Sequence, residues 1–248
     1  MKNFFMITLG VLLGMLPKSL LAQGNAVFQR PITPGMQTQS SSFVLGGSDF
    51  DLDAYDVFYD EAIPAPEPEQ FRFGYQTEYG WGAHHFGAGL DLGAGFGENN
   101  EDIRAQFLTT LIHASYGYAV LQVPRWRLMP FAGVSLGNTN LHVYNERELD
   151  ASDIAEEPFQ EVQINHLGFA GRAGIKLDYF YNSLRGLDED DEEDEPHWGL
   201  LGITFSYLWG PEYDSGWYHA GGAIDNAPEN NLQGFMLGLR VGDISGRD

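Results

Sequence analysis

Residues 85–100 read HFGAGLDLGAGFGENN, and the alternation in this stretch decides the fold. Apolar side chains occupy every second position from Phe86 to Phe96, whereas the positions between them hold four glycines and Asp91. A period of two residues is that of a β-strand, because successive side chains of a strand point to opposite faces. One face of this strand is therefore apolar, and the other is almost free of side chains.

The same alternation recurs along most of the chain and predicts about eight strands. Several of the segments approach the ~9–11 residues that a tilted strand needs to cross a bilayer. We therefore expect an all-β fold, an up-and-down antiparallel transmembrane β-barrel. The segments are residues 40–50, 71–81, 85–96, 103–123, 128–144, 162–181, 198–209 and 232–242.

The connections between these segments alternate in length. Long connections follow the first, third, fifth and seventh segments, and short connections follow the second and fourth. The sixth connection carries the acidic run LDEDDEEDEP (187–196) and breaks the rule by being long. Alternation of long outer loops and short turns is typical of outer-membrane barrels.

The two faces of the expected strands suit different surroundings. The apolar, aromatic face suits lipid, whereas the glycine-rich face fits the narrow interior of a barrel of about eight strands. Charged residues of both signs fall on that inner face, and buried charges have to be paired, because desolvation costs on the order of several kcal/mol each. We therefore expect a network of ion pairs that fills the lumen, formed by Arg72, Glu78, Asp91, Arg172, Lys176, Asp178 and Arg240.

Composition excludes several classes of function. The chain has 248 residues, a formal net charge of −22 and no cysteine. A surface that binds nucleic acid should be basic, so nucleic acid is not expected as a partner. The lack of cysteine excludes disulfides, thiolate metal sites and cysteine nucleophiles.

The N-terminal residues predict export. Lys2, an apolar run from Phe4 to Leu16 and a small residue, Ala22, at the expected cleavage site are the parts of a secretory signal peptide. We expect residues 1–22 to be the signal peptide, 23–39 an extended periplasmic leader, 40–243 the barrel and 244–248 a tail. No later segment approaches the ~20 apolar residues of a spanning helix, so the mature chain is expected to cross a membrane only as a closed barrel.

Four stretches carry a resemblance to a known family. They are FRFGYQTEYGWG (71–82), FGAGLDLGAGFG (86–97), SYGYAVLQVPRWRLMPFAGVSLG (115–137) and GFMLGLRVG (234–242). Together with the signal peptide, they resemble the small outer-membrane β-barrels of Gram-negative bacteria, the OmpA/OmpX-like, porin-family barrels. The resemblance implies a place in the outer membrane, contact with its lipid, and assembly by periplasmic chaperones and the barrel-assembly machinery. The end of the chain, VGDISGRD (241–248), departs from the aromatic terminal residue that this machinery often reads.

The stretch DFDLDAYDVFYD (49–60) is a candidate metal site. Its carboxylates Asp49, Asp51, Asp53 and Asp60 fall on ligand positions of an EF-hand-like calcium loop. Ala54 stands where that loop needs glycine, so the stretch predicts a weak calcium site.

His113 and Ser115 are a candidate catalytic pair. Their His-x-Ser spacing puts both side chains on one face of a strand, as in barrel-embedded lipid deacylases. No acid stands at a nearby position on the next strand to orient the histidine, because the tight connection PRWR (124–127), with Arg127, and an apolar stretch follow instead. Both residues are therefore expected to be polar lumen residues.

The sequence thus predicts a small outer-membrane barrel with a side-chain-filled lumen and acidic outer loops. Its role is expected to be structural or interactive, with an extracellular ligand of the loops, no cofactor, no enzymatic activity and no general diffusion. One alternative is a soluble periplasmic barrel that binds a small apolar ligand in its interior. Another is a barrel-embedded lipid acyl hydrolase that uses His113 and Ser115.

Overall fold

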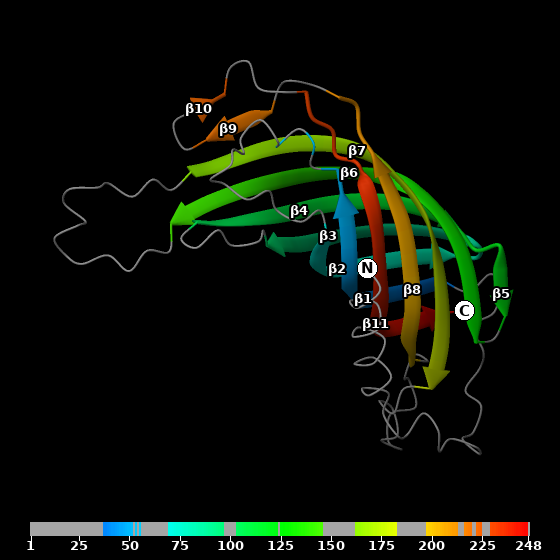
Figure 1. Ribbon diagram of the computed structural model, residues 1–248. Helices are drawn as coiled ribbons and strands as arrows, with labels where there is room; N and C mark the ends of the chain where they lie inside the picture. Colours follow the sequence, from blue (N-terminus) through cyan, green and yellow to red (C-terminus); the bar gives the residue numbers. More distant parts are fainter. Residues whose placement is uncertain are drawn as a thin grey trace, which may run out of the picture. The chain divides into compact units, whose positions relative to one another are not determined.

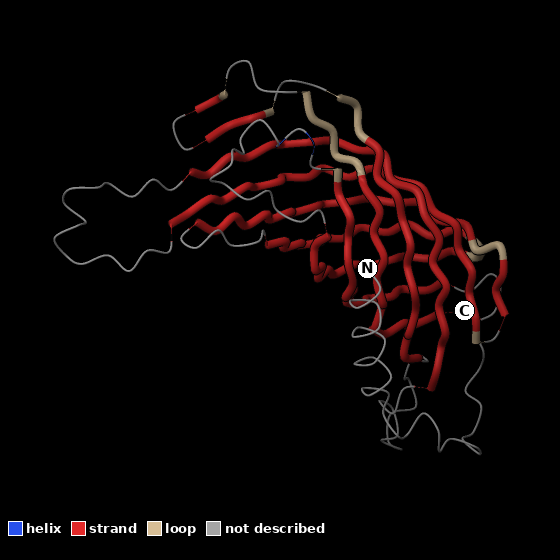
Figure 2. Tube along the Cα trace, in the orientation of Figure 1, coloured by secondary structure: helices blue, strands red, loops and turns tan. Residues whose placement is uncertain are grey.

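The described part of the computed structural model is almost entirely β-strand (Figure 1, Figure 2). Among the described residues there is no helix long and apolar enough to cross a membrane. The structure describes residues 37–51, 53, 55, 69–96, 103–123, 125–145, 162–182, 197–212, 216–219, 222–224 and 229–247.

Eight antiparallel strands close into a barrel, because the last of them pairs with the first. This confirms the fold class that the alternation predicts. Each strand pairs with the one before it and the one after it, which is the up-and-down arrangement. The strands are β1 (Gln37–Phe50), β2 (Glu69–Trp81), β3 (His84–Phe96), β4 (Ile103–Tyr118), β6 (Trp126–Asn145), β7 (Val162–Asn182), β8 (His197–Trp209) and β11 (Gly234–Arg247).

The barrel strands extend beyond the predicted limits. β1 begins at Gln37, inside the predicted leader, and β11 ends at Arg247, so residues 244–247 belong to a strand and not to a tail. The two ends pair with each other, since Gln37 lies opposite Arg247. Backbone pairing at the seam of the barrel therefore continues where the side-chain pattern fades.

The two ends of the barrel carry different connections. We call the end that holds the connections after β1, β3, β6 and β8 the loop end, and the opposite end the turn end. At the turn end, Gly82 and Ala83 join β2 to β3, and Gly82 has a φ of 61°, which favours glycine. The short strand β5 (Leu121–Val123) folds back on the start of β6.

Two further short strands extend the sheet at the loop end. β9 (Trp217–His219) pairs with β7, and β10 (Gly222–Ala223) pairs with β9. Figure 1 shows β9 (orange) beside the beginning of β7 (yellow-green), with β10 beyond it. Their place on β7 brings a connection between β8 and β11 against the longest strands of the barrel.

Candidate functional site

The outward face of the barrel is an apolar belt. Every barrel strand exposes large apolar side chains on this face, with Ile112 60% and Phe86 57% exposed. A soluble protein does not leave such a continuous apolar surface in water, whereas lipid accommodates it. The soluble alternative required these side chains to point inward, and the structure has them pointing outward.

Glycine on the inward face makes room for charged side chains. Gly202 of β8 lies between Asp178 of β7 and Arg240 of β11 in the strand register. A Cβ atom at Gly202 would collide with the Asp178 carboxylate, so the two charged side chains meet across a strand that carries none there. Gly74 has the same relation to Asp91, because a Cβ atom there would collide with its carboxylate.

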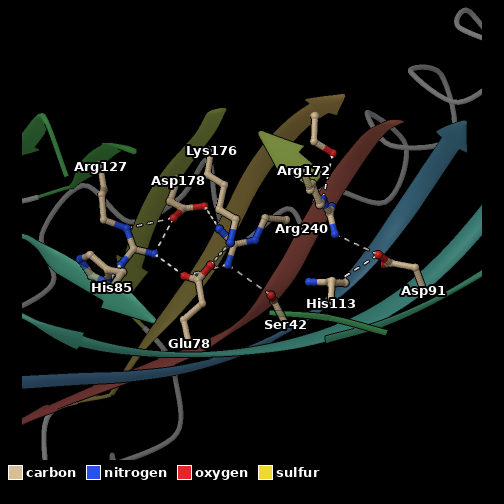
Figure 3. Close-up of polar contacts among 11 residues, drawn as sticks. Ser42, Glu78, His85, Asp91, His113, Arg127, Arg172, Lys176, Asp178 and Arg240 are labelled. Atoms are coloured by element: carbon tan, nitrogen blue, oxygen red, sulfur yellow. Dashed lines mark hydrogen bonds and ion pairs between the residues drawn. The ribbon is translucent and has the colours of Figure 1, made fainter. Parts of the chain in front are cut away.

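Five charged side chains form one group, which we call the central cluster: Glu78, Arg127, Lys176, Asp178 and Arg240 (Figure 3). Asp178 lies 2.6 Å from Arg127 through one oxygen and 2.6 Å from Arg240 through the other. Glu78 lies 3.2 Å from Arg127 and 3.3 Å from Arg240, and it also pairs with Lys176. Two carboxylates thus bridge three cations, and the five side chains come from four strands.

Neutral side chains complete the contacts of the central cluster. Arg127 Nη1 lies 3.1 Å from Nδ1 of His85, and its guanidinium lies 5.4 Å from the centre of the Phe180 ring. Arg240 Nη2 donates to the hydroxyl of Ser42 at 3.4 Å. Charged groups with this many partners are held in one arrangement, which suits a structural core.

A second group, the Asp91 cluster, contains Arg72, Asp91, His113 and Arg172. The Asp91 carboxylate pairs with Arg72, lies 3.1 Å from His113 Nε2 and lies 3.4 Å from Arg172 Nη1. Arg172 also donates from Nε to the hydroxyl of Ser206 at 3.2 Å. Here one carboxylate serves two guanidinium groups.

The structure places all seven lumen residues named from the sequence inside the barrel and divides them between the two clusters. Arg127 is not among them, because the sequence PRWR (124–127) predicts a tight connection there. It is instead the second residue of β6 and lies directly opposite Asp178. Arg127 could have been identified from the sequence, because it continues the inward-facing positions of the following strand back to the turn at Pro124.

The expectation that His113 has no acid nearby is wrong. Its partner, Asp91, lies on the preceding strand, β3, and not on the following one. Among the described residues, His113 contacts Asp91 through Nε2, and its Nδ1 has no hydrogen-bond partner, so it is not bonded to Ser115. His113 points into the lumen, away from the lipid that a deacylase would act on.

The predicted calcium ligands are only partly described. Asp49, Asp51 and Asp53 have exposed side chains, and Asp60 lies outside the described residues. The Asp53 backbone N–H donates to the Asp51 carboxylate at 3.1 Å. Within the described part of the chain, no three His, Asp or Glu side chains form a group that could hold a metal ion.

At the loop end the interior changes character. A buried apolar cluster, which we call the loop-end cluster, replaces the charges there: Tyr55, Ala105, Phe107, Leu141, Val143, Ile164 and Trp217. The Tyr55 ring meets Phe107 and Trp217 edge-on at 5.0 and 4.9 Å, and its hydroxyl pairs with Thr139. Burial raises the pKa of Tyr55, so this hydroxyl stays protonated.

The outward face changes in the opposite sense at the same level. On β7, the exposed side chains of Leu167 and Ile175 are followed toward the loop end by Asn165, which is buried where β9 pairs with β7, and then by the exposed Gln163. On β6, polar side chains follow Leu136, and Asn140 donates to Asn165 at 2.7 Å across the two strands. The apolar belt therefore ends near these asparagines, and the strands continue beyond it.

An apolar exterior around a charged interior, in a closed barrel, is the arrangement of a protein that crosses a membrane with strands. The fold is that of an outer-membrane β-barrel. In such a barrel the strands pair all their backbone groups with one another, so no polar edge faces the lipid.

Comparison with known proteins finds similar barrels among solved structures only. No protein-family model matches the chain, and no curated protein matches it in sequence. Ail, the attachment invasion locus protein of Yersinia pestis, is 11% identical with a TM-score of 0.40, covering 87% of this chain and 100% of Ail. Its complex with the heparin analogue sucrose octasulfate, at 11% identity, gives 0.39 over the same shares. Neisserial surface protein A (NspA) is 11% identical with a TM-score of 0.33, covering 85% of this chain and 96% of NspA. These TM-scores are too low to support an argument, so the fold assignment rests on the strand pairing of the barrel itself.

Proposed function

We propose that this chain is a small outer-membrane barrel whose interior is a structural core and whose loop end is an ordered platform for interaction outside the membrane. The observation that carries the proposal is the change of polarity at the end of the apolar belt. Inside the belt the exterior is apolar, and the interior holds the buried charges together with apolar side chains such as Leu111, Leu208 and Met236. Beyond the belt, among the described residues, the interior holds the loop-end cluster without buried charges, and the exterior is polar. The second arrangement is that of a β-sheet standing in water.

The lengths of β6 and β7 support the same proposal. β6 has 20 residues and β7 has 21, whereas crossing a bilayer takes about 9–11. The excess lies toward the loop end, where β9 adds a further strand to β7 and Tyr218 donates to Asn138 at 2.9 Å. The loop end thus has its own packed core and its own hydrogen bonds.

The interior supports a closed barrel. Eight strands enclose a lumen that is filled by the two charged clusters and the loop-end cluster. Phe131 also lies there, beside the cations Arg172 and Lys176. Barrels of this size are filled by side chains. Among the described residues the buried bases exceed the buried acids, whereas the whole chain is strongly acidic. We therefore expect a platform partner to present basic groups.

Two measurements test this function. In planar bilayers we expect no large, stable conductance, and a steady open level of the size of a general porin would contradict the closed interior. On intact cells, a protease added outside should cut within residues 146–161 and leave the belt strands whole. Cleavage from the periplasmic side alone would contradict the orientation.

A further inference from the structure

Positive charge is in excess inside the barrel. Among the described residues, the buried charged side chains comprise five bases and three acids. They are Arg72, Arg127, Arg172, Lys176 and Arg240 on one side, and Glu78, Asp91 and Asp178 on the other. A buried charge without compensation is strongly unfavourable, so the lumen needs further negative charge.

Among these bases, Arg72 has the most hydrogen-bond donors without a partner. This side chain is 2% exposed, and its Nη2 pairs with Asp91, but its Nε and Nη1 have no hydrogen-bond partner. Glycine lies directly opposite it on both neighbouring strands, Gly46 on β1 and Gly93 on β3. Neither directly opposite position therefore offers a side chain to the guanidinium, and its one carboxylate partner, Asp91, lies two residues before Gly93 on β3. In the central cluster, by contrast, no side-chain nitrogen of Arg127, Lys176 or Arg240 is left buried without a hydrogen-bond partner.

Two further buried donors on the same face lack partners. They are Nε2 of Gln70, two residues before Arg72 on β2, and the hydroxyl of Ser48, directly opposite Gln70 on β1. Thr109 donates to Oε1 of Gln70 at 2.9 Å, which turns the amide nitrogen away from β4. Side chains directly opposite or two residues apart on one face of a sheet are close enough to share a small ligand.

We propose that a small inorganic anion of the size of chloride binds in the lumen between Arg72, Gln70 and Ser48. One negative charge would balance the second guanidinium of the Asp91 cluster. The same ion would accept hydrogen bonds from the three residues whose donors have no partner. A water molecule would satisfy the donors and leave the charge uncompensated.

The test is the dependence of barrel stability on chloride. The chain is folded in detergent micelles and unfolded by urea at constant ionic strength, in sodium chloride or in sodium gluconate, whose anion is much larger than chloride. We expect the urea midpoint to be higher in chloride and to rise with the logarithm of chloride concentration, corresponding to one ion released per chain. Arg72→Gln should abolish this dependence, and Ser48→Ala, which keeps every charge, should weaken it.

A matched control removes a buried hydroxyl elsewhere in the lumen. Thr204→Val on β8 deletes another unpartnered hydroxyl and should retain the full chloride dependence. Equal midpoints in the two salts, or the same chloride dependence in wild type and Ser48→Ala, would overturn the proposal even if Arg72→Gln does not fold. Crystals grown in bromide should show one anomalous peak beside Arg72, and a peak at the protein surface only would mean an adventitious ion. The folded band on a gel of unboiled protein reports barrel closure separately, so a negative result here leaves the proposed function standing.

Discussion

The apolar belt and the loop end are built from the same strands with opposite polarity. Along β7, Lys176 and Asp178 point into the lumen while Ile175 points to lipid. Toward the loop end of the same strand, Ile164 is buried inside while Gln163 is exposed outside. The alternation of faces continues without a break, and only the kind of residue on each face is exchanged.

The comparison teaches that alternation determines the two faces of a strand and that the surroundings determine which face is apolar. In lipid, the outside is apolar and the inside has to hold its charges in pairs. In water, the inside is apolar, and the loop-end cluster packs as the core of a soluble protein does. The four predictions below test each side of this contrast, from the largest expected effect to the smallest.

Removing the carboxylate shared by two arginines should break the interior of the belt. Asp178→Ala leaves Arg127 and Arg240 with an unbalanced buried charge, and we expect the free energy of unfolding to fall by about 3–5 kcal/mol. Urea unfolding in micelles measures the loss. The control is Asp243→Ala on β11, whose side chain is exposed and which should change stability little. Equal losses in the two variants would show that the central cluster does not hold the barrel.

A charge placed on the outward face should separate the two regions directly. Ile175→Lys puts an ammonium group on the belt, where a cation near the bilayer midplane costs about 2–4 kcal/mol. Gln163→Lys, on the same face of the same strand, lies beyond the belt and should cost almost nothing. Folding yield and urea midpoints in lipid vesicles measure both. A loss of stability of similar size for Gln163→Lys would place Gln163 inside the membrane and contradict the polarity change.

Adding one methyl group should show why the inward face needs glycine. Gly202→Ala places a Cβ against the Asp178 carboxylate and 2.9 Å from the backbone oxygen of Leu177, and we expect a loss of about 1–3 kcal/mol. Gly87→Ala is the matched comparison, because its Cβ would meet Ser115 Oγ at 3.0 Å and no closer atom. The temperature at which the folded band disappears from a gel should drop further for Gly202→Ala than for Gly87→Ala. The reverse order would argue that the space which Gly202 leaves for the Asp178 carboxylate is not important for stability.

The smallest effect is expected in the loop-end cluster. Tyr55→Phe keeps the packing against Phe107 and Trp217 and removes the hydroxyl that pairs with Thr139, so the loss should be about 0.5–1.5 kcal/mol. Because this cluster lies beyond the belt, the change should appear as faster hydrogen exchange in residues 139–143 while β2 and β3 stay protected. Uniform loss of protection across the barrel would show that the two regions unfold as one.

The positions that alternation could not assign are those that depend on a neighbour in space. Pro124 predicts a turn that includes Arg127, but β6 already begins at Trp126, where it pairs with β7. The acid beside His113 was sought on the following strand, and it lies on the preceding one. Both errors concern which residues of neighbouring strands lie opposite each other, and the sequence of one segment alone does not give that information.

The sequence by itself determined the strands, their two faces and the small, glycine-lined interior, because the period of two is a local property of the extended backbone. Closure of the barrel was set by the tertiary structure, since β1 meets β11 across nearly the whole chain. The same closure decided which charges pair, because Glu78, Asp178 and Arg240 meet only when three distant strands take their register. The loop-end cluster was likewise a product of the fold, since Tyr55 and Trp217 come together only once β9 pairs with β7.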